Sequence, residues 1–288
     1  MEAKHSNNKP LILFFLLACV PAWLLMGLFV AQNHGWFPPG IPFEPVLIIG
    51  SWIPNFAAFL VIAFILKRKG GIRNLLQGWL KFKVPAFWYL VTLTPVAFSL
   101  LSIPVYRLLY GVNPASEILF DPVAMFALLI IATITGATGE ELGWRGFALP
   151  RLQTRMSALS ASLLLGVIWT IWHAPLWFAG LGYERIPFAA YAILVISSTV
   201  LITWACNNSG GSMVIASLFH LTMNIAMNII DTKALYVYAI LIMAAAVFVV
   251  LMYGPSRLSK AAELPIDMKT VDWQDQPEKV FVRVNVST

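Results

Sequence analysis

The sequence contains little charge. Only 11% of its 288 residues are Asp, Glu, Lys or Arg, whereas 59% are hydrophobic and the mean hydropathy is +0.79. Soluble domains contain about 25% charged and about 45–50% apolar residues. The composition therefore excludes an ordinary soluble enzyme and predicts a chain that crosses a membrane several times.

Cysteine and histidine are also scarce, with two and four residues respectively. Cys19 and Cys206 lie in separate apolar segments, so the sequence predicts neither a disulfide framework nor a cysteine-based metal site. The zinc-helix signature His-Glu-x-x-His is absent, which excludes that class of metalloprotease helix. The chain shows no internal repeat.

Long apolar segments dominate the chain. A span takes roughly 20 apolar residues, and eight segments reach that length. They are approximately residues 11–31, 46–66, 86–110, 122–143, 158–179, 188–206, 212–231 and 234–254. We expect an all-α polytopic membrane protein with eight transmembrane helices over residues 1–254. A polar cytoplasmic tail over 255–288 follows, in which Val280–Val286 alternates like a short strand.

The basic residues predict an orientation, because Lys and Arg accumulate in cytoplasmic loops. Of the 19 Lys and Arg residues, 16 fall before the first span, within 67–83, within 145–155 or in the tail. The other three, on the opposite side, are Arg107, Arg185 and Lys233. We therefore expect both termini in the cytoplasm.

The first chemically informative stretch is Gly136-Ala-Thr-Gly-Glu-Glu-Leu-Gly-Trp-Arg-Gly, at the end of the fourth apolar run. Ionisable groups at membrane depth cost about 2.5–3.5 kcal/mol each on insertion scales and are usually functional. Glu141 and Arg145 are four residues apart, so on a helix they share a face and form an ion pair. Glu140 points elsewhere without a counter-ion, which suits a general base. The alternative is a cytoplasmic cap in which all three side chains lie among the lipid headgroups.

Two further motifs lie in later spans. Trp169 and His173 are one turn apart in the fifth, where Trp169 can wall a pocket and Pro175 interrupts the backbone. His220 and Asn224 are one turn apart in the seventh, a pair suited to metal ligation or to oxyanion stabilisation. Taken alone, each pair is equally compatible with hydrogen bonds between packed helices.

Together the motifs are more specific than any one of them. A carboxylate, two histidines and an asparagine on neighbouring spans predict an active site. A proton-coupled transporter would use the same residues as a relay, but it would require repeat symmetry between two halves of the chain.

The order Glu-Glu-x-x-x-Arg, aromatic-x-x-x-His, His-x-x-x-Asn resembles the CAAX prenyl endoprotease and bacteriocin-processing (CPBP, or Abi) family of intramembrane proteases. Residues Glu140, Glu141, Arg145, His173, His220 and Asn224 match this pattern. The resemblance covers roughly residues 120–230. Trp169 stands where the family commonly has Phe.

The resemblance implies an intramembrane endopeptidase of a prokaryotic cell membrane with a membrane-embedded catalytic cavity. Glu140 and His173 would activate a water, while His220 and Asn224 would bind the oxyanion. One divalent metal such as Zn²⁺, with Glu140, His173 and His220 as candidate ligands, and a metal-free glutamate mechanism are both compatible with these residues.

The resemblance also implies the partners. The substrate would be a membrane-associated peptide or protein, prenylated at a CAAX-type end or carrying a leader, that reaches the site from the lipid or the cytoplasmic side. The alternative is a non-enzymatic bacteriocin self-immunity or membrane interaction protein on the same fold. Nothing in the sequence indicates nucleic-acid binding.

The predicted depths of the site residues disagree. Counted from these boundaries at about 1.5 Å per residue, Glu140 lies within several Å of the cytoplasmic surface, whereas His220 and His173 lie roughly 13 and 20 Å deep. We therefore expect the helix that bears Glu140 and Arg145 to lie deeper than hydropathy indicates. Either Gly136 and Gly139 loosen it, or Ala148–Arg151 dips into the bilayer.

Overall fold

The computed structural model describes residues 8–36, 38, 40 and 42–260. These residues form α-helices joined by short 3₁₀ and π segments, and no strand occurs among them apart from one isolated bridge between Ala115 and Ile230. The protein is thus an all-α polytopic membrane protein, as the sequence predicts. The expected strand at Val280–Val286 lies outside the described residues.

The helices follow one another along the chain with few long connections. The first half contains α1 (Lys9–Asn33), α2 (Phe43–Leu60), α3 (Gly71–Leu76), α4 (Ala86–Val91), α5 (Thr94–Tyr110) and α6 (Pro122–Ala132). The second half contains α7 (Leu149–Gln153), α8 (Ala158–His173), α9 (Phe188–Asn208), α10 (Met213–Asn228) and α11 (Leu235–Tyr253).

One of the eight expected membrane-crossing helices is shorter than the sequence predicts. Among the described residues, seven helices are long and apolar enough to span a membrane, whereas the sequence predicts eight. The difference is α10, in which only 16 of the residues predicted as span 212–231 are helical. Ser212 caps its first turn, and the chain leaves the helix after Asn228 to pair with the segment around Ala115.

The fourth span is longer than predicted. Its helix continues past residue 143, so that Pro122–Gln153 forms 32 residues of nearly continuous helix. Glu140 therefore lies 13 residues, or about 20 Å, from its C-terminal end. This added length removes the disagreement in depth between Glu140 and the two histidines, and it makes Arg145 and Arg151 helical and buried instead of loop residues.

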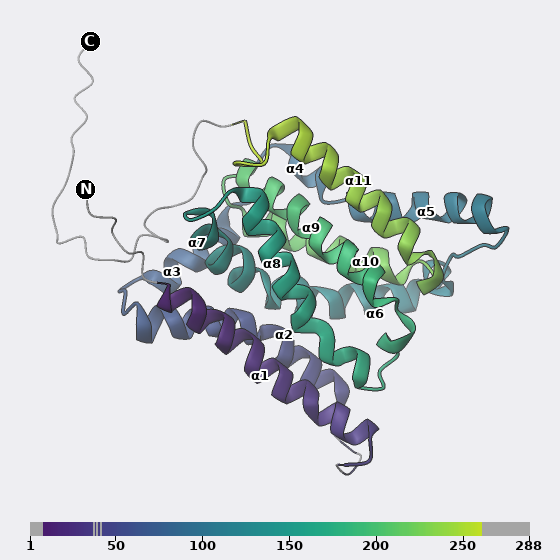
Figure 1. Ribbon diagram of the computed structural model, residues 1–288, viewed down its shortest axis with the longest axis horizontal. Helices are drawn as coiled ribbons and strands as arrows, with labels where there is room; N and C mark the ends of the chain where they lie inside the picture. Colours follow the sequence, from purple (N-terminus) through teal and green to yellow (C-terminus); the bar gives the residue numbers. More distant parts are fainter. Residues whose placement is uncertain (1–7, 37, 39, 41, 261–288) are drawn as a thin grey trace.

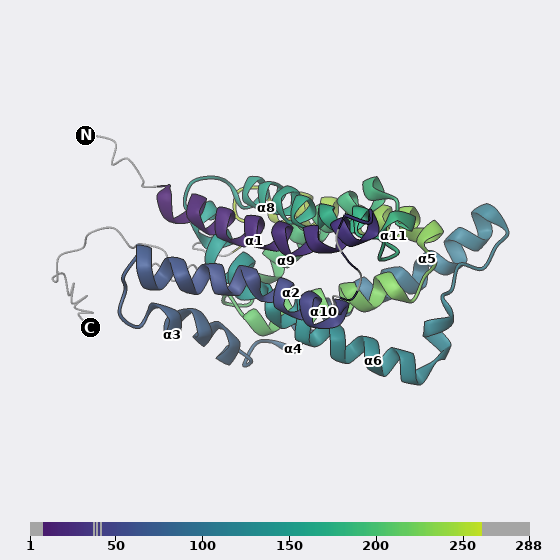
Figure 2. The same ribbon diagram turned by 90° about the horizontal axis from the view of Figure 1, so that it is seen from below.

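The bundle is built around α9. In Figure 1, α8 and α11 flank α9, while α1 and α2 lie together along one edge of the molecule. Seen from below in Figure 2, α1, α8 and α11 lie above α2, α6 and α10. The residues of the predicted site come from α8 in one layer and from α10 and the segment after α6 in the other. They therefore meet in the interior, between the two layers.

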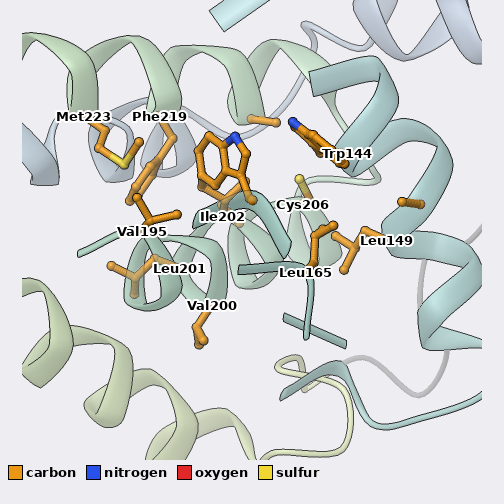
Figure 3. Close-up of a cluster of buried hydrophobic side chains, with 14 of the residues drawn as sticks. Trp144, Leu149, Leu165, Val195, Val200, Leu201, Ile202, Cys206, Phe219 and Met223 are labelled. Atoms are coloured by element: carbon orange, nitrogen blue, oxygen red, sulfur yellow. The ribbon is translucent and has the colours of Figure 1, made fainter. Parts of the chain in front are cut away.

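The core beside α9 is apolar and tightly packed. Figure 3 shows Val195, Ile202 and Cys206 of α9 close to Trp144 and Phe219, and all five side chains are buried. The hydroxyls of Thr199 and Thr203 in this helix donate to the carbonyls of Val195 and Thr199, one turn earlier, both at 2.8 Å. Such back-bonding satisfies a hydroxyl inside a bundle without a partner helix. Both cysteines are buried and free.

Candidate active site

The backbone that carries the two glutamates is an irregular helix. Two π-helical segments, Thr133–Ala137 and Leu142–Ala148, flank the pair, and Thr135 has φ −86° and ψ −105°, outside the helical region. Single π-turns widen a helix locally and recur at functional sites. The loosening expected near Gly136 is therefore present, and it turns both carboxylates into the bundle.

Asn55 of α2 holds this irregular segment. Its side-chain amide donates to the carbonyl of Thr138 at 2.8 Å, and its carbonyl oxygen accepts from the backbone N–H of Gly143 at 2.9 Å. Asn55 is fully buried. One side chain thus satisfies two backbone groups on either side of Glu140 and Glu141. Sequence reasoning missed it, because a lone asparagine in an apolar span carries no periodic signal.

Close packing against α2 depends on glycine. A Cβ at Gly139 would lie 2.9 Å from the carbonyl oxygen of Ser51, and one at Gly143 would lie 2.5 Å from that of Pro54. Small residues at such crossings let helix backbones approach in membranes. The two glycines therefore allow Asn55 to reach the glutamate segment.

Glu140 is buried and is contacted by two indoles. The Nε1–H of Trp169 donates to its Oε2 at 2.7 Å, and the Nε1–H of Trp144 donates to the same oxygen at 3.2 Å. No basic side chain forms an ion pair with it among the described residues. The carboxylate is thus held by neutral donors on one oxygen.

Glu141 binds two partners through one oxygen. Its Oε1 lies 2.8 Å from Nη1 of Arg145 and 2.8 Å from Nδ1 of His220. The guanidinium also lies over the ring of Trp169, with Cζ 4.3 Å from the ring centroid. The division between a paired and an unpaired glutamate matches the spacing argument, and the bond to His220 adds a link that this argument did not include.

The two histidines present their Nε2 atoms to the interior. Nδ1 of His173 lies 2.9 Å from the carbonyl oxygen of Trp169. Since a carbonyl accepts, Nδ1 carries the proton and Nε2 is left as the acceptor. Nδ1 of His220 faces Glu141, and its Nε2 lies near Gly136, where an added Cβ would be 2.7 Å away. The Nδ2 of Asn224 would lie 2.9 Å from the same Cβ.

These groups meet at a cavity of about 180 Å³. Glu140, His173, His220 and Asn224 all line it, together with Gly136 of the irregular segment. The cavity contains a carboxylate, two ring nitrogens and an amide, which is the donor and acceptor set required to hydrolyse a peptide bond.

The predicted position of Trp169 needs a correction. The sequence predicts that it walls the pocket, but its ring is buried behind Glu140 and is not among the lining residues. The ring turns inward because its N–H bonds the carboxylate and its face packs on Arg145. Trp172, three residues later, lines the cavity in its place.

Two tyrosines that the sequence did not suggest also line the cavity. They are Tyr183, in the connection after α8, and Tyr191, in the first turn of α9. Burial raises the pKa of the Tyr183 phenol above its usual value, and the charge of Glu140 raises it further. Its hydroxyl therefore stays protonated at neutral pH and can donate a hydrogen bond to a ligand in the cavity.

The donor set does not fit a metal ion. Among the described residues, no group of three or more His, Cys, Asp or Glu side chains is placed to hold one. Glu140, His173 and His220, the candidate ligands from the sequence, line one cavity without forming such a group. Oε2 of Glu140 accepts from two indole N–H groups and Nδ1 of His220 faces Glu141, so ligation would have to use Oε1 of Glu140 and the Nε2 atoms of the histidines.

Comparison with known proteins agrees with this geometry. Residues 122–226 match the family model of the Rce1-like type II CAAX prenyl endopeptidases. A curated relative, CAAX prenyl protease 2 of Methanococcus maripaludis, is 34% identical over 139 residues, covering 44% of this chain and 49% of the relative. The chain thus matches the curated relative over about half of each protein's length. The resemblance drawn from the motifs is thus confirmed over residues 122–226, which are similar to the Rce1-like CAAX prenyl endopeptidases.

Proposed function

We propose that the protein is an intramembrane endopeptidase that hydrolyses a peptide bond in a membrane-associated substrate. The observation that carries this proposal is the gathering of Glu140, His173, His220 and Asn224 around one cavity. The relative from Methanococcus maripaludis, a CAAX prenyl protease by name, supports the same reaction class, and a prenylated CAAX-type or leader-containing peptide is a candidate substrate.

The residues divide into a base and an oxyanion site. Glu140, assisted by Nε2 of His173, removes a proton from a water in the cavity. The hydroxide forms a C–O bond with the peptide carbonyl carbon, and the oxyanion accepts hydrogen bonds from Nδ2 of Asn224 and Nε2 of His220. For Nε2 of His220 to donate while Nδ1 donates to Glu141, both ring nitrogens must carry protons in this step. The C–N bond then breaks, and the amine leaves with the proton that Glu140 accepted. The products are a carboxylic acid and an amine, and Glu140 is regenerated as the carboxylate.

Glu141 and Arg145 act by positioning. Arg145 donates a hydrogen bond to Oε1 of Glu141. The same oxygen bonds Nδ1 of His220, which fixes the imidazole in one rotation. With Nδ1 held, Nε2 points at the position of the oxyanion. A buried partner that orients a histidine is a recurring feature of histidine catalysts.

We further propose one transmembrane domain over residues 1–254 with a polar tail, in a prokaryotic cell membrane. The charge bias favours cytoplasmic termini. Pro255, Ser256, Arg257 and Leu258 are bonded through their carbonyls to the start of α8 and the end of α9, so the chain beyond α11 returns to the same end of the bundle as those helices.

The test compares protein termini in membranes and medium. Wild type and Glu140→Gln are expressed at equal levels in a strain that lacks the gene. Termini that appear only with wild type would establish proteolysis and identify the substrate. We expect the variant to lose about 10²–10⁴-fold in rate, because it removes the base while keeping the shape of the side chain. Identical termini for both proteins would instead favour the immunity or interaction protein.

Chelation provides a second test. We expect the purified protein to retain its activity after dialysis against EDTA and 1,10-phenanthroline, because the donors around the cavity do not form a metal site. Activity is measured on a substrate identified from the termini. Loss on chelation, with recovery on adding Zn²⁺, would contradict the metal-free mechanism.

A further inference from the structure

The cavity occupies one end of the bundle. Its lining reaches Met26 in the last third of α1, Leu47 in the first turns of α2 and Leu128 in the first quarter of the 32-residue helix Pro122–Gln153. It continues to Tyr183 and to Asn228, the last residue of α10. None of the lining residues comes from 66–85, 141–157, 209–212 or 254–260, which lie at or toward the other end.

The side chains become less buried toward the same end. Asn228 is exposed, Asn224 one turn before it is partly exposed, and His220 another turn deeper is buried. The eight residues from His220 to Asn228 correspond to a rise of about 12 Å. A polar line along α10 thus leads from the end of the bundle to the oxyanion donors, and apolar side chains such as Ile131, Leu176 and Met227 form the walls around it.

The two ends differ strongly in charge. We call the basic end the one formed by the start of α1 and by 66–85, 154–157, 209–212 and 254–260. The opposite end is formed by 34–36, 111–121, 179–187 and 229–234 together with the helix ends that they join. Of the 15 Lys and Arg residues in the described chain, 12 lie toward the basic end, or ten without the buried Arg145 and Arg151. Three lie toward the opposite end, where five acidic residues accompany them, namely Glu44, Glu117, Asp121, Glu184 and Asp231.

Lys and Arg near the ends of spans mark the cytoplasmic side. The basic end is therefore cytoplasmic, and the cavity mouth lies at the other face. We propose that the catalytic cavity opens to the extracytoplasmic side and takes a peptide segment exposed there. This inference rests on the proposed function, and it reverses the side of access that the sequence alone led us to expect.

The side chains around the opening of the cavity indicate which residue types a substrate should have. Apolar walls favour an apolar segment next to the scissile bond. The excess of acidic residues at the opposite end favours basic residues on the water-exposed flank of the substrate. A translocated, membrane-anchored peptide with these features fits, whereas a chain end displayed in the cytoplasm would face the basic end and the wrong side of the bundle.

Cysteine labelling tests the orientation without requiring activity. Cys19 and Cys206, both buried, are replaced by alanine, and single cysteines are introduced at two exposed positions, Glu184→Cys at the opposite end and Lys69→Cys at the basic end. Intact cells are treated with a membrane-impermeant maleimide. We expect labelling of Glu184→Cys at once and of Lys69→Cys only after permeabilisation. The reverse pattern, or equal labelling of both positions in intact cells, would overturn the inference.

The termini experiment then separates the two proposals. Cleavage sites that depend on Glu140 and lie in extracytoplasmic segments would support both. Sites confined to cytoplasmic segments would support the endopeptidase and overturn the inference about access. The expected labelling pattern without any cleavage dependent on Glu140 would keep the orientation of the cavity, overturn the proteolytic function and, with it, the peptide substrate.

Discussion

At the scale of single residues, the site depends on the absence of a side chain at Gly136. His220 and Asn224 approach its backbone so closely that a methyl group would lie 2.7 and 2.9 Å from their nitrogen atoms. Real Cβ atoms do not approach other heavy atoms at such distances, so one of the two side chains would have to move. The oxyanion donors are therefore set by a glycine on a different helix.

We expect Gly136→Ala to reduce activity at least about 100-fold, because a shift of about 1 Å in a positioned group costs that much. The measurement is the cleavage rate of an identified substrate, with the melting temperature in detergent to show that the protein is folded. Gly27→Ala in α1 is a matched control, since a Cβ there meets nothing within 4 Å. Equal rates for Gly136→Ala and wild type would contradict this geometry.

The buried ion pair gives a second prediction at this scale. Arg145→Met removes the cation but leaves Glu141 buried, and we expect the free energy of unfolding to fall by about 3–5 kcal/mol. Adding Glu141→Gln neutralises the stranded carboxylate, so the double variant should regain part of that loss. Denaturation in detergent measures the free energy of unfolding of the single and the double variant. A double variant less stable than the sum of the single changes would contradict the expected coupling.

At the scale of elements, the site is an irregular helix clamped by a neighbour. Widened turns expose backbone groups that a regular α-helix would satisfy internally. Asn55 on α2 bonds two of these groups, the Thr138 carbonyl and the Gly143 amide. The N–H of Trp52, also on α2, donates to the carbonyl of Ile134 at 2.8 Å. The shape of the glutamate segment is thus a property of two helices together.

We expect Asn55→Ala to lower the free energy of unfolding by about 1–3 kcal/mol for each group left unbonded. We also expect a lower cleavage rate, because Glu140 lies between the two anchored backbone groups. Asn55→Asp keeps the acceptor for Gly143 but buries a carboxylate against the Thr138 carbonyl, so it should lower the stability and the cleavage rate at least as much. Asn113→Ala, at an exposed position, is the control. A rate unchanged in Asn55→Ala would show that α2 does not position the glutamates.

The elements also show how far the sequence can be interpreted. Hydropathy located nearly every span, because apolar length is a local property. The motif spacing predicted pairs on one helix face, such as Glu141 with Arg145, since one helical turn is a fixed distance. The grouping of Glu140, His173 and His220 came instead from the scarcity of ionisable residues in the spans and from the family resemblance. The π-turns, Asn55 and Trp144 were not found, because a widened turn has no sequence period and a bond between α2 and the glutamate segment spans more than 80 residues. The length of the fourth helix was missed because its buried arginines resemble a loop in composition.

At the scale of the whole molecule, the surface is apolar. Large side chains such as Leu108, Val123 and Leu251 are more than three-quarters exposed, at 86%, 76% and 78%. Soluble monomers rarely expose contiguous apolar patches beyond about 300–600 Å². The seven long apolar helices place most of these side chains where lipid would contact them.

We accordingly expect the protein to remain in the membrane fraction after washing with alkaline carbonate and to be released only by detergent. Immunoblotting of the pellet and supernatant measures this, and a peripheral membrane protein in the same sample is the control. Release by carbonate would contradict an integral position in the bilayer.

The contact between Glu140 and two indoles has an optical consequence. Trp144 and Trp169 donate their N–H groups to the same carboxylate oxygen. The near-ultraviolet absorption and fluorescence of an indole respond to the strength of its N–H hydrogen bond, and that strength falls when the acceptor loses its charge. Difference spectra between wild type and variants with Phe at either tryptophan would therefore report the ionisation of Glu140 from inside the membrane, before any substrate is known.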